Sequence, residues 1–125
     1  MLGDIKKTRR QLAKSISPAP RGAVLEIVAS GDENLVGARF AVGSELAIGR
    51  AQDNDIVLND NYVSHHHAAI MRRKNLYVIE DLGSVNHTYV NDRELAGRSY
   101  LKPGDVIRIG MATLVFGGES HAKSS

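Results

Sequence analysis

Short apolar runs with a period of two residues are the feature that most constrains how this chain can fold. They recur between residues 23 and 117, and turn-forming stretches such as Pro103-Gly104-Asp105 separate them at intervals of about 8–12 residues. In one such run, Ala68 and Ile70 fall on the same face of an extended chain. Runs this short with this period favour strands, and no segment after residue 22 shows a convincing helical period. We therefore expect an all-β fold, a β-sandwich whose loops gather at its ends.

Composition limits the core and excludes several classes of protein. The chain has 125 residues, of which 42% are hydrophobic, 5% are aromatic and none is tryptophan, so we expect one domain with an aliphatic core. Cysteine is absent, which excludes disulfides and thiolate metal sites. No apolar run approaches the length of a membrane-spanning helix, and the N-terminus lacks the apolar region of a secretory signal. We expect a cytoplasmic protein with no integral membrane segment.

The positive charge of the chain is concentrated near its N-terminus. Residues 1–22 carry six Lys and Arg side chains and one carboxylate, Asp4, so the rest of the chain has a net charge of −3 although the total is +2. The lack of a basic excess beyond residue 22 argues against nucleic acid as a partner. We expect a basic flexible leader at 1–22, one domain at 23–117 and a flexible tail at 118–125. Such an arrangement is typical of a monomeric module of a larger protein or assembly.

The first polar motif is Gly49-Arg50, which directly follows an expected strand. Glycine allows a sharp turn or a close approach of the backbone to a ligand. Arginine presents a planar fork of donors that suits a phosphate group. Taken alone, however, the pair is better explained as a turn with a surface arginine.

The second motif is Ser64-His65-His66-His67, at the entry to another expected strand. Three consecutive histidines suggest a metal site, but in a strand His65 and His67 face one way and His66 the other, so we expect no bound metal. Serine with histidine suggests a hydrolase, but Ser64 lacks the strand-to-helix elbow of a Gly-x-Ser-x-Gly motif. We therefore do not expect an enzyme. The serine hydroxyl can instead donate to a phosphate or cap a turn.

The third motif is the segment 81–88, Asp-Leu-Gly-Ser-Val-Asn-His-Thr. The amide of Asn86 has both a donor and an acceptor, so it can bind the backbone of a peptide. The alternative is a polar turn built from Asx and Ser/Thr hydrogen bonds.

In this order and spacing, the three motifs resemble the pattern of the forkhead-associated (FHA) domain family: Gly-Arg, then Ser-x-x-His, then Asp-x-x-Ser-x-Asn-Gly-Thr. The stretches 54–58 and 101–110 are also similar to the family, so the resemblance covers residues 23–117. It implies a sandwich of about eleven strands with ligand-binding loops at one end. It further implies an adaptor module in signalling that binds phosphothreonine peptides and needs no cofactor. Its partner would be a phosphothreonine-containing protein, the substrate of a Ser/Thr kinase.

The resemblance also implies roles for single residues. Arg50 would hold the phosphate, Ser64 would donate its hydroxyl to it, and Asn86 would hydrogen-bond the peptide main chain. The neighbouring His65 and Val85 would contact the ligand. The residues expected to support the site are Gly49, His67, Ser84, His87 and Thr88.

Three of these positions depart from the family pattern. His87 stands where glycine is usual, and it is strained if the turn there needs a positive φ. Val85 replaces a hydroxyl or basic residue that often grips the ligand, whereas His65, when protonated, adds a charge-assisted bond. These changes leave open an alternative function, a protein-interaction FHA domain that does not depend on phosphate.

Overall fold

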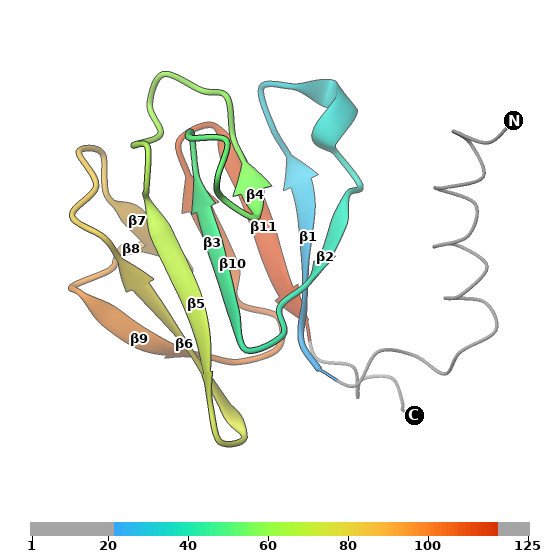
Figure 1. Ribbon diagram of the computed structural model, residues 1–125, viewed down its shortest axis with the longest axis vertical. Coiled ribbons are helices and arrows are strands. Elements are labelled where there is room, and N and C mark those ends of the chain that lie inside the picture. Colours follow the sequence, from blue (N-terminus) through green and yellow to red (C-terminus); the bar gives the residue numbers. More distant parts are fainter. Residues whose placement is uncertain (1–21, 118–125) are drawn as a thin grey trace, which may run out of the picture.

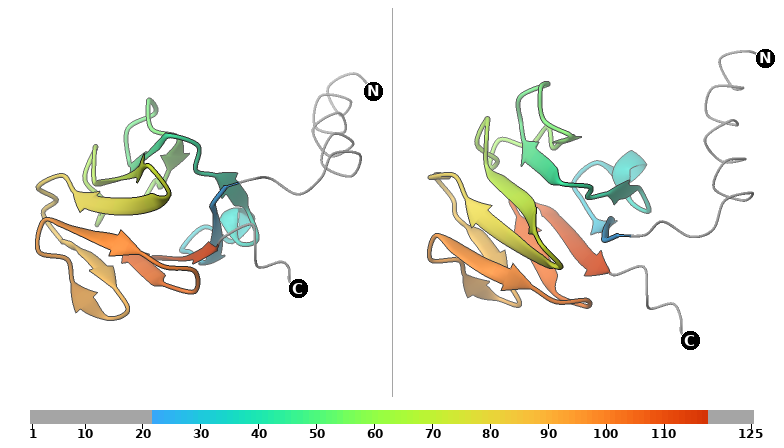
Figure 2. Two further views of the ribbon diagram at one scale, coloured as in Figure 1. Left: turned by 90° about the horizontal axis from the view of Figure 1, so that it is seen from below. Right: turned by 60° about the horizontal axis from the view of Figure 1, so that its bottom comes forward.

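The computed structural model describes residues 22–117, which form two β-sheets packed face to face (Figure 1, Figure 2). The eleven strands and one short 3-10 helix are, in chain order, β1 (Val24–Ala29), η1 (Glu33–Leu35), β2 (Arg39–Ala41), β3 (Glu45–Gly49), β4 (Ile56–Val57), β5 (Ala68–Arg73), β6 (Leu76–Asp81), β7 (Thr88–Val90), β8 (Arg93–Glu94), β9 (Arg98–Leu101), β10 (Val106–Ile109) and β11 (Ala112–Gly117). This architecture confirms the all-β sandwich expected from the sequence. The leader and tail expected at 1–22 and 118–125 lie outside the described residues, except for Gly22.

The two sheets are built almost entirely from antiparallel pairs. One has six strands in the order β2-β1-β11-β10-β7-β8, and the other has five in the order β4-β3-β5-β6-β9. Within the described part of the chain, only β3 and β4 pair in parallel. Each sheet therefore ends, on the same side of the sandwich, in strands from the segment 88–101. No helix long and apolar enough to cross a membrane occurs among residues 22–117.

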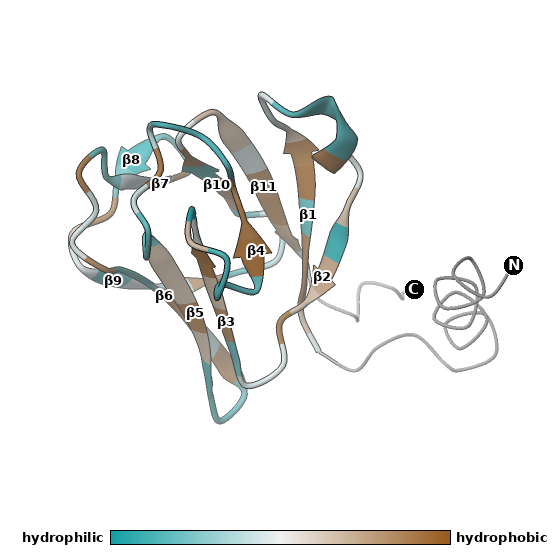
Figure 3. Cartoon of the chain, turned by 45° about the horizontal axis from the view of Figure 1, so that its top comes forward, coloured by the Kyte–Doolittle hydropathy of each residue, from teal (hydrophilic) through white to brown (hydrophobic). Residues whose placement is uncertain are grey.

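The core between the sheets is aliphatic, as the composition predicts. In β11, Ala112, Leu114 and Phe116 are buried while the residues between them are partly exposed. In Figure 3 most of the brown, hydrophobic residues lie in the strands, and much of the teal lies in the connecting loops. The fully buried large side chains that fill the interior are Leu25, Ile27, Ile48, Ile56, Leu58, Ile70, Ile79, Ile107, Ile109 and Leu114. By burying these alternate positions the chain fixes the register of both sheets.

Two details differ from the sequence-based expectation. The pattern did not predict β8 or β9, which are short edge strands rich in charged and polar residues. Charged residues are common on sheet edges because they oppose pairing with other chains, so no alternation marks these strands. In addition, β5 begins at Ala68, which leaves His65, His66 and His67 in the preceding loop.

Candidate ligand-binding loops

Three loops meet at one end of the sandwich: the β3–β4 loop, the β4–β5 loop and the β6–β7 loop (Figure 1). The first two are joined by backbone hydrogen bonds. The N–H of Arg50 donates to the carbonyl of Ser64 at 2.9 Å, and the N–H of Ala51 donates to the carbonyl of His65 at 3.1 Å. The Asn54 amide adds two bonds of 2.8 Å, to the carbonyls of Ala51 and His65. Arg50 and Ser64 are thereby held side by side.

Gly49 is required by this junction for a steric reason. A Cβ atom at this position would lie 2.2 Å from the carbonyl oxygen of His65 and 2.8 Å from the Asn54 amide nitrogen. Any side chain would therefore push the two loops apart. The predicted supporting role of Gly49 has this close approach as its physical basis.

His67 connects the β4–β5 loop to the β6–β7 loop. Its ring is fully buried, its Nδ1 accepts a hydrogen bond of 3.0 Å from the N–H of Ser64, and its Nε2 donates to the carbonyl of His87 at 2.9 Å. These contacts require the neutral tautomer with the proton on Nε2. A single imidazole therefore positions Ser64 against the segment that carries Asn86.

Asp81 organises the β6–β7 loop from inside. One carboxylate oxygen accepts bonds of 2.6 Å from the Ser84 hydroxyl and 2.7 Å from the Thr88 hydroxyl. The other accepts bonds of 3.0 Å from the N–H groups of Gly83 and Ser84. Burial acts to raise the pKa of Asp81, but the hydrogen bonds from Ser84, Thr88 and Gly83 together outweigh it and hold this pKa below its usual range.

The turn after Asn86 does adopt the conformation that favours glycine. His87 has φ 68°, so a non-glycine residue lies in the left-handed region at this tip. Its Nδ1 lies 3.3 Å from a carboxylate oxygen of Glu94 on β8, and both side chains are about half exposed. His87 thus adopts the positive φ that favours glycine, at some conformational cost, and its side chain lies next to Glu94 of β8.

Arg50, Ser64 and Asn86 retain unused polar groups. The Nε of Arg50 donates to the carbonyl of Val63 at 3.0 Å, and the guanidinium makes no ion pair among residues 22–117. The Ser64 hydroxyl oxygen accepts from the N–H of Val85 at 3.1 Å, which leaves its proton to donate elsewhere. The Asn86 amide nitrogen donates to the carbonyl of Tyr62 at 3.0 Å, and its oxygen stays available. One hydrogen bond therefore fixes each side chain, and each keeps another polar group that has no partner among residues 22–117.

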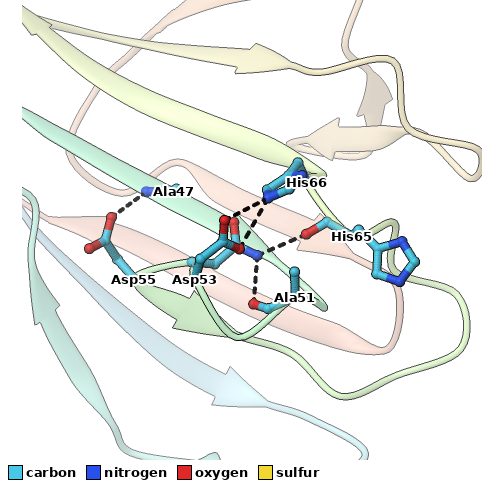
Figure 4. A network of polar contacts seen from close by, with 7 residues as sticks. Ala47, Ala51, Asp53, Asp55, His65 and His66 are labelled. Atoms are coloured by element: carbon cyan, nitrogen blue, oxygen red, sulfur yellow. Dashed lines mark hydrogen bonds and ion pairs between the residues drawn. The ribbon is translucent and has the colours of Figure 1, made fainter.

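The remaining two predicted contact residues, His65 and Val85, are exposed, and Val85 is 79% accessible. Figure 4 shows the His65 ring directed away from His66, whose Nε2 lies 3.1 and 3.2 Å from the two carboxylate oxygens of Asp53. The three histidines thus point to three different surroundings. The prediction that these side chains alternate as in a strand was wrong, because residues 65–67 lie in a loop. Among residues 22–117, no group of three His, Asp or Glu side chains is placed to hold a metal.

Sequence reasoning gave no role to Asn54 or Tyr62, and it included Asp81 only as the first residue of the third motif. The polar turn weighed there as an alternative, built from Asx and Ser/Thr hydrogen bonds, is the arrangement that Asp81 makes. Asn54 and Tyr62 had no signal in the sequence, since their contacts cross 11 and 24 residues of sequence. Their roles depend on which loops the fold brings together.

Comparison with known proteins gives a consistent result. The FHA domain family model matches residues 46–110. An oxoglutarate dehydrogenase inhibitor of Corynebacterium jeikeium is 44% identical over 98 residues, which cover 78% of this chain and 66% of that protein. The glycogen accumulation regulator GarA of Mycobacterium tuberculosis is 39% identical over 98 residues, covering 78% of this chain and 59% of that protein. The chain therefore spans less than two thirds of the length of these relatives.

Among solved structures, Mycobacterium tuberculosis EmbR in complex with a low-affinity phosphopeptide superimposes with a TM-score of 0.68. The sequence identity is 28%, and the match covers 90% of this chain and 30% of that one. The similarity thus covers most of this chain and a minor part of EmbR.

Proposed function

The chain belongs to the FHA domain family, and from this premise we propose that it is an adaptor module that binds phosphothreonine-containing peptides. Its role would be phosphorylation-dependent protein–protein interaction, with a partner that is the substrate of a Ser/Thr kinase. The observation that carries the proposal is the convergence of Arg50, Ser64 and Asn86 on three loops that are already bonded to one another. The domain that performs this role would be residues 23–117.

The chemistry of the three side chains suits a phosphorylated residue in an extended peptide. A phosphate at neutral pH carries about −1.5 to −2 charges and three strong acceptor oxygens. The free guanidinium nitrogens of Arg50 and the hydroxyl proton of Ser64 are complementary donors. The free oxygen of Asn86 accepts from a peptide N–H beside the phosphothreonine. His65, exposed at the same rim, adds positive charge when it is protonated.

The names of the relatives also support a binding role rather than a catalytic one. One is an inhibitor of a dehydrogenase and another is a regulator of glycogen accumulation. Both names, an inhibitor and a regulator, describe a regulatory role. We therefore propose a regulatory module without a catalytic site.

The test is peptide binding measured by calorimetry or fluorescence anisotropy. Phosphothreonine peptides from a library should bind, and their unmodified forms should not. Arg50→Ala should weaken binding by about 10- to 100-fold, because it removes charge-assisted hydrogen bonds to the phosphate. Arg73→Ala, which removes an exposed arginine on the β5–β6 hairpin, should leave the affinity unchanged. Equal affinity of wild type and Arg50→Ala would refute the phosphate pocket.

A second candidate function is protein interaction that does not depend on phosphate. The observation in its favour is the apolar rim of the loop end, where Tyr62, Leu82 and Val85 are 59%, 43% and 79% exposed. Large exposed apolar side chains at a binding end are typical of a protein contact. A partner that retains full affinity after phosphatase treatment, and binds Arg50→Ala as well as wild type, would favour this function over the first.

A further inference from the structure

A groove of about 610 Å³ lies between the edge strands β8 and β9, outside the three ligand-binding loops. β8 ends the six-stranded sheet and β9 ends the five-stranded sheet, and they lie near each other on the same side of the sandwich (Figure 1, Figure 2). Among residues 22–117 each is paired on one flank only, so each leaves backbone N–H and C=O groups on its outer flank. An extended peptide segment is the ligand shape that such edges suit best.

The side chains of the groove favour an acidic ligand. Arg93, Arg98 and Lys102 are exposed along it, and within residues 22–117 neither Arg93 nor Lys102 forms an ion pair. Arg98 has one partner, Glu80, at a distance of 3.7 Å. Tyr100 adds an aromatic ring that is 62% exposed. The groove thus combines three exposed cations with one exposed aromatic ring.

The groove also contains two carboxylates, and one of them is buried. Asp105 is 6% exposed, and its oxygens accept bonds from the Asn91 amide at 3.0 Å and from the N–H of Lys102 at 2.8 Å. Glu94 is about half exposed, and one of its oxygens lies 3.3 Å from Nδ1 of His87. The lining therefore holds three cations against two carboxylates, whereas the net charge of the chain beyond residue 22 is −3.

The pair between Glu94 and His87 also links the groove to the β6–β7 loop. His87 belongs to the β6–β7 loop and follows Asn86 directly, whereas Glu94 lines the groove from β8. The lining of the groove therefore contacts the β6–β7 loop, which carries Asn86.

We propose that the groove between β8 and β9 binds an acidic, extended segment of the same phosphoprotein that the loops recognise. This proposal rests on the proposed function and adds a second contact to it. The loop site reads the phosphothreonine, and the groove reads the charge of a segment some residues away. Two linked contacts raise affinity because binding of the first supplies a high local concentration for the second.

The test uses the full-length chain and three phosphothreonine peptides that share one core. The first is the core alone, and the others carry a Gly/Ser spacer and a tract of glutamates on its N-terminal or C-terminal side. At low salt, one of the extended peptides should bind about tenfold more tightly than the core, as expected for a few exposed ion pairs acting together. This gain should disappear at high salt.

Two charge-reversed variants distinguish binding in the groove from unspecific attraction between the glutamate tract and the protein surface. Arg93→Glu/Lys102→Glu should lose the gain and keep its affinity for the core peptide. Arg73→Glu/Lys74→Glu, which makes the same charge change at the opposite end of the sandwich on the β5–β6 hairpin, should keep the gain. The basic residues at 1–22 are present in both variants, so they cannot account for a difference between them.

The outcomes distinguish failure of the groove from failure of the loop site. If neither extension improves binding, or if both variants lose the gain equally, the groove proposal is wrong while the core peptide still tests the proposed function. If the core peptide does not bind, the proposed function is wrong. In that case a glutamate peptide without phosphothreonine tests the groove proposal. Tighter binding of this peptide to wild type than to Arg93→Glu/Lys102→Glu would support the groove proposal, and equal binding would overturn it.

Discussion

Substitution of Gly49 by alanine should be far more damaging than its small size suggests. Gly49 is buried at the end of β3, and the added Cβ would lie 2.2 Å from the carbonyl oxygen of His65. Ordinary van der Waals contact begins at 3.4 Å, so the carbonyl must retreat by more than an ångström. The displaced group is backbone, which cannot rotate away as the end of a side chain can.

The expected cost follows from the bonds that this retreat breaks. The same carbonyl accepts hydrogen bonds from the N–H of Ala51 at 3.1 Å and from the Asn54 amide at 2.8 Å. Each lost bond costs about 1 kcal/mol, and the overpacking adds about 1–3 kcal/mol. We therefore expect Gly49→Ala to lower the free energy of unfolding by about 3 kcal/mol or more. For a domain of this size that corresponds to a fall in Tm of about 12–20 °C.

Thermal and urea denaturation followed by circular dichroism would measure this loss. The matched control is Gly117→Ala at the end of β11, where the nearest atom to a new Cβ is 3.9 Å away. That substitution should be neutral or stabilise by about 0.4–1 kcal/mol, because alanine restricts the unfolded chain. If the two variants unfold at the same temperature, the steric account of Gly49 is wrong.

Three further predictions concern the loops. Because the pKa of Asp81 is lowered in the folded state, its carboxylate stabilises the fold at pH values above 3.8, the ordinary pKa of the group, and this contribution is lost as pH falls through the lowered pKa. Between about pH 5 and pH 2, the free energy of unfolding measured with urea should therefore fall less in Asp81→Asn than in wild type. Equal losses in the two proteins would contradict this. His67→Ala should cost about 3–4 kcal/mol in urea unfolding, because it leaves a cavity and removes the partners of the Ser64 N–H and the His87 carbonyl; a loss below about 1 kcal/mol would contradict the bridging role. Val85→Arg should raise affinity for phosphothreonine peptides by about three- to tenfold without changing Tm, since Val85 is 79% exposed; unchanged affinity would place this position outside the ligand contact.

The interior strands could be predicted from the sequence, whereas the edges could not. β11 has its buried side chains at every second residue, and this alternation is visible in the sequence. β8 and β9 contain Arg93, Glu94, Arg98 and Ser99, which bury little. Their strand conformation comes from pairing with β7 and β6, so it depends on tertiary contacts that no local pattern records.

The candidate site, too, could be predicted only in part. The resemblance indicated Arg50, Ser64 and Asn86, and the structure brings all three to one end of the sandwich. The sequence left open whether the turn at His87 needs a positive φ, and the structure gives it φ 68°. The hydrogen-bonding role of Asn54 was not predicted, because its amide joins two loops whose proximity exists only in the folded chain.

The bridge that His67 makes between Ser64 and His87 has a consequence for the kinetics of recognition. His67 joins the two loops through hydrogen bonds within the chain itself, so we expect that no slow ordering step precedes or follows encounter. Observed association rates should then rise linearly with peptide concentration and show no plateau. Differences among phosphopeptide sequences should appear mainly in dissociation rates. Partner proteins would be sorted by how long each complex lasts rather than by how quickly it forms.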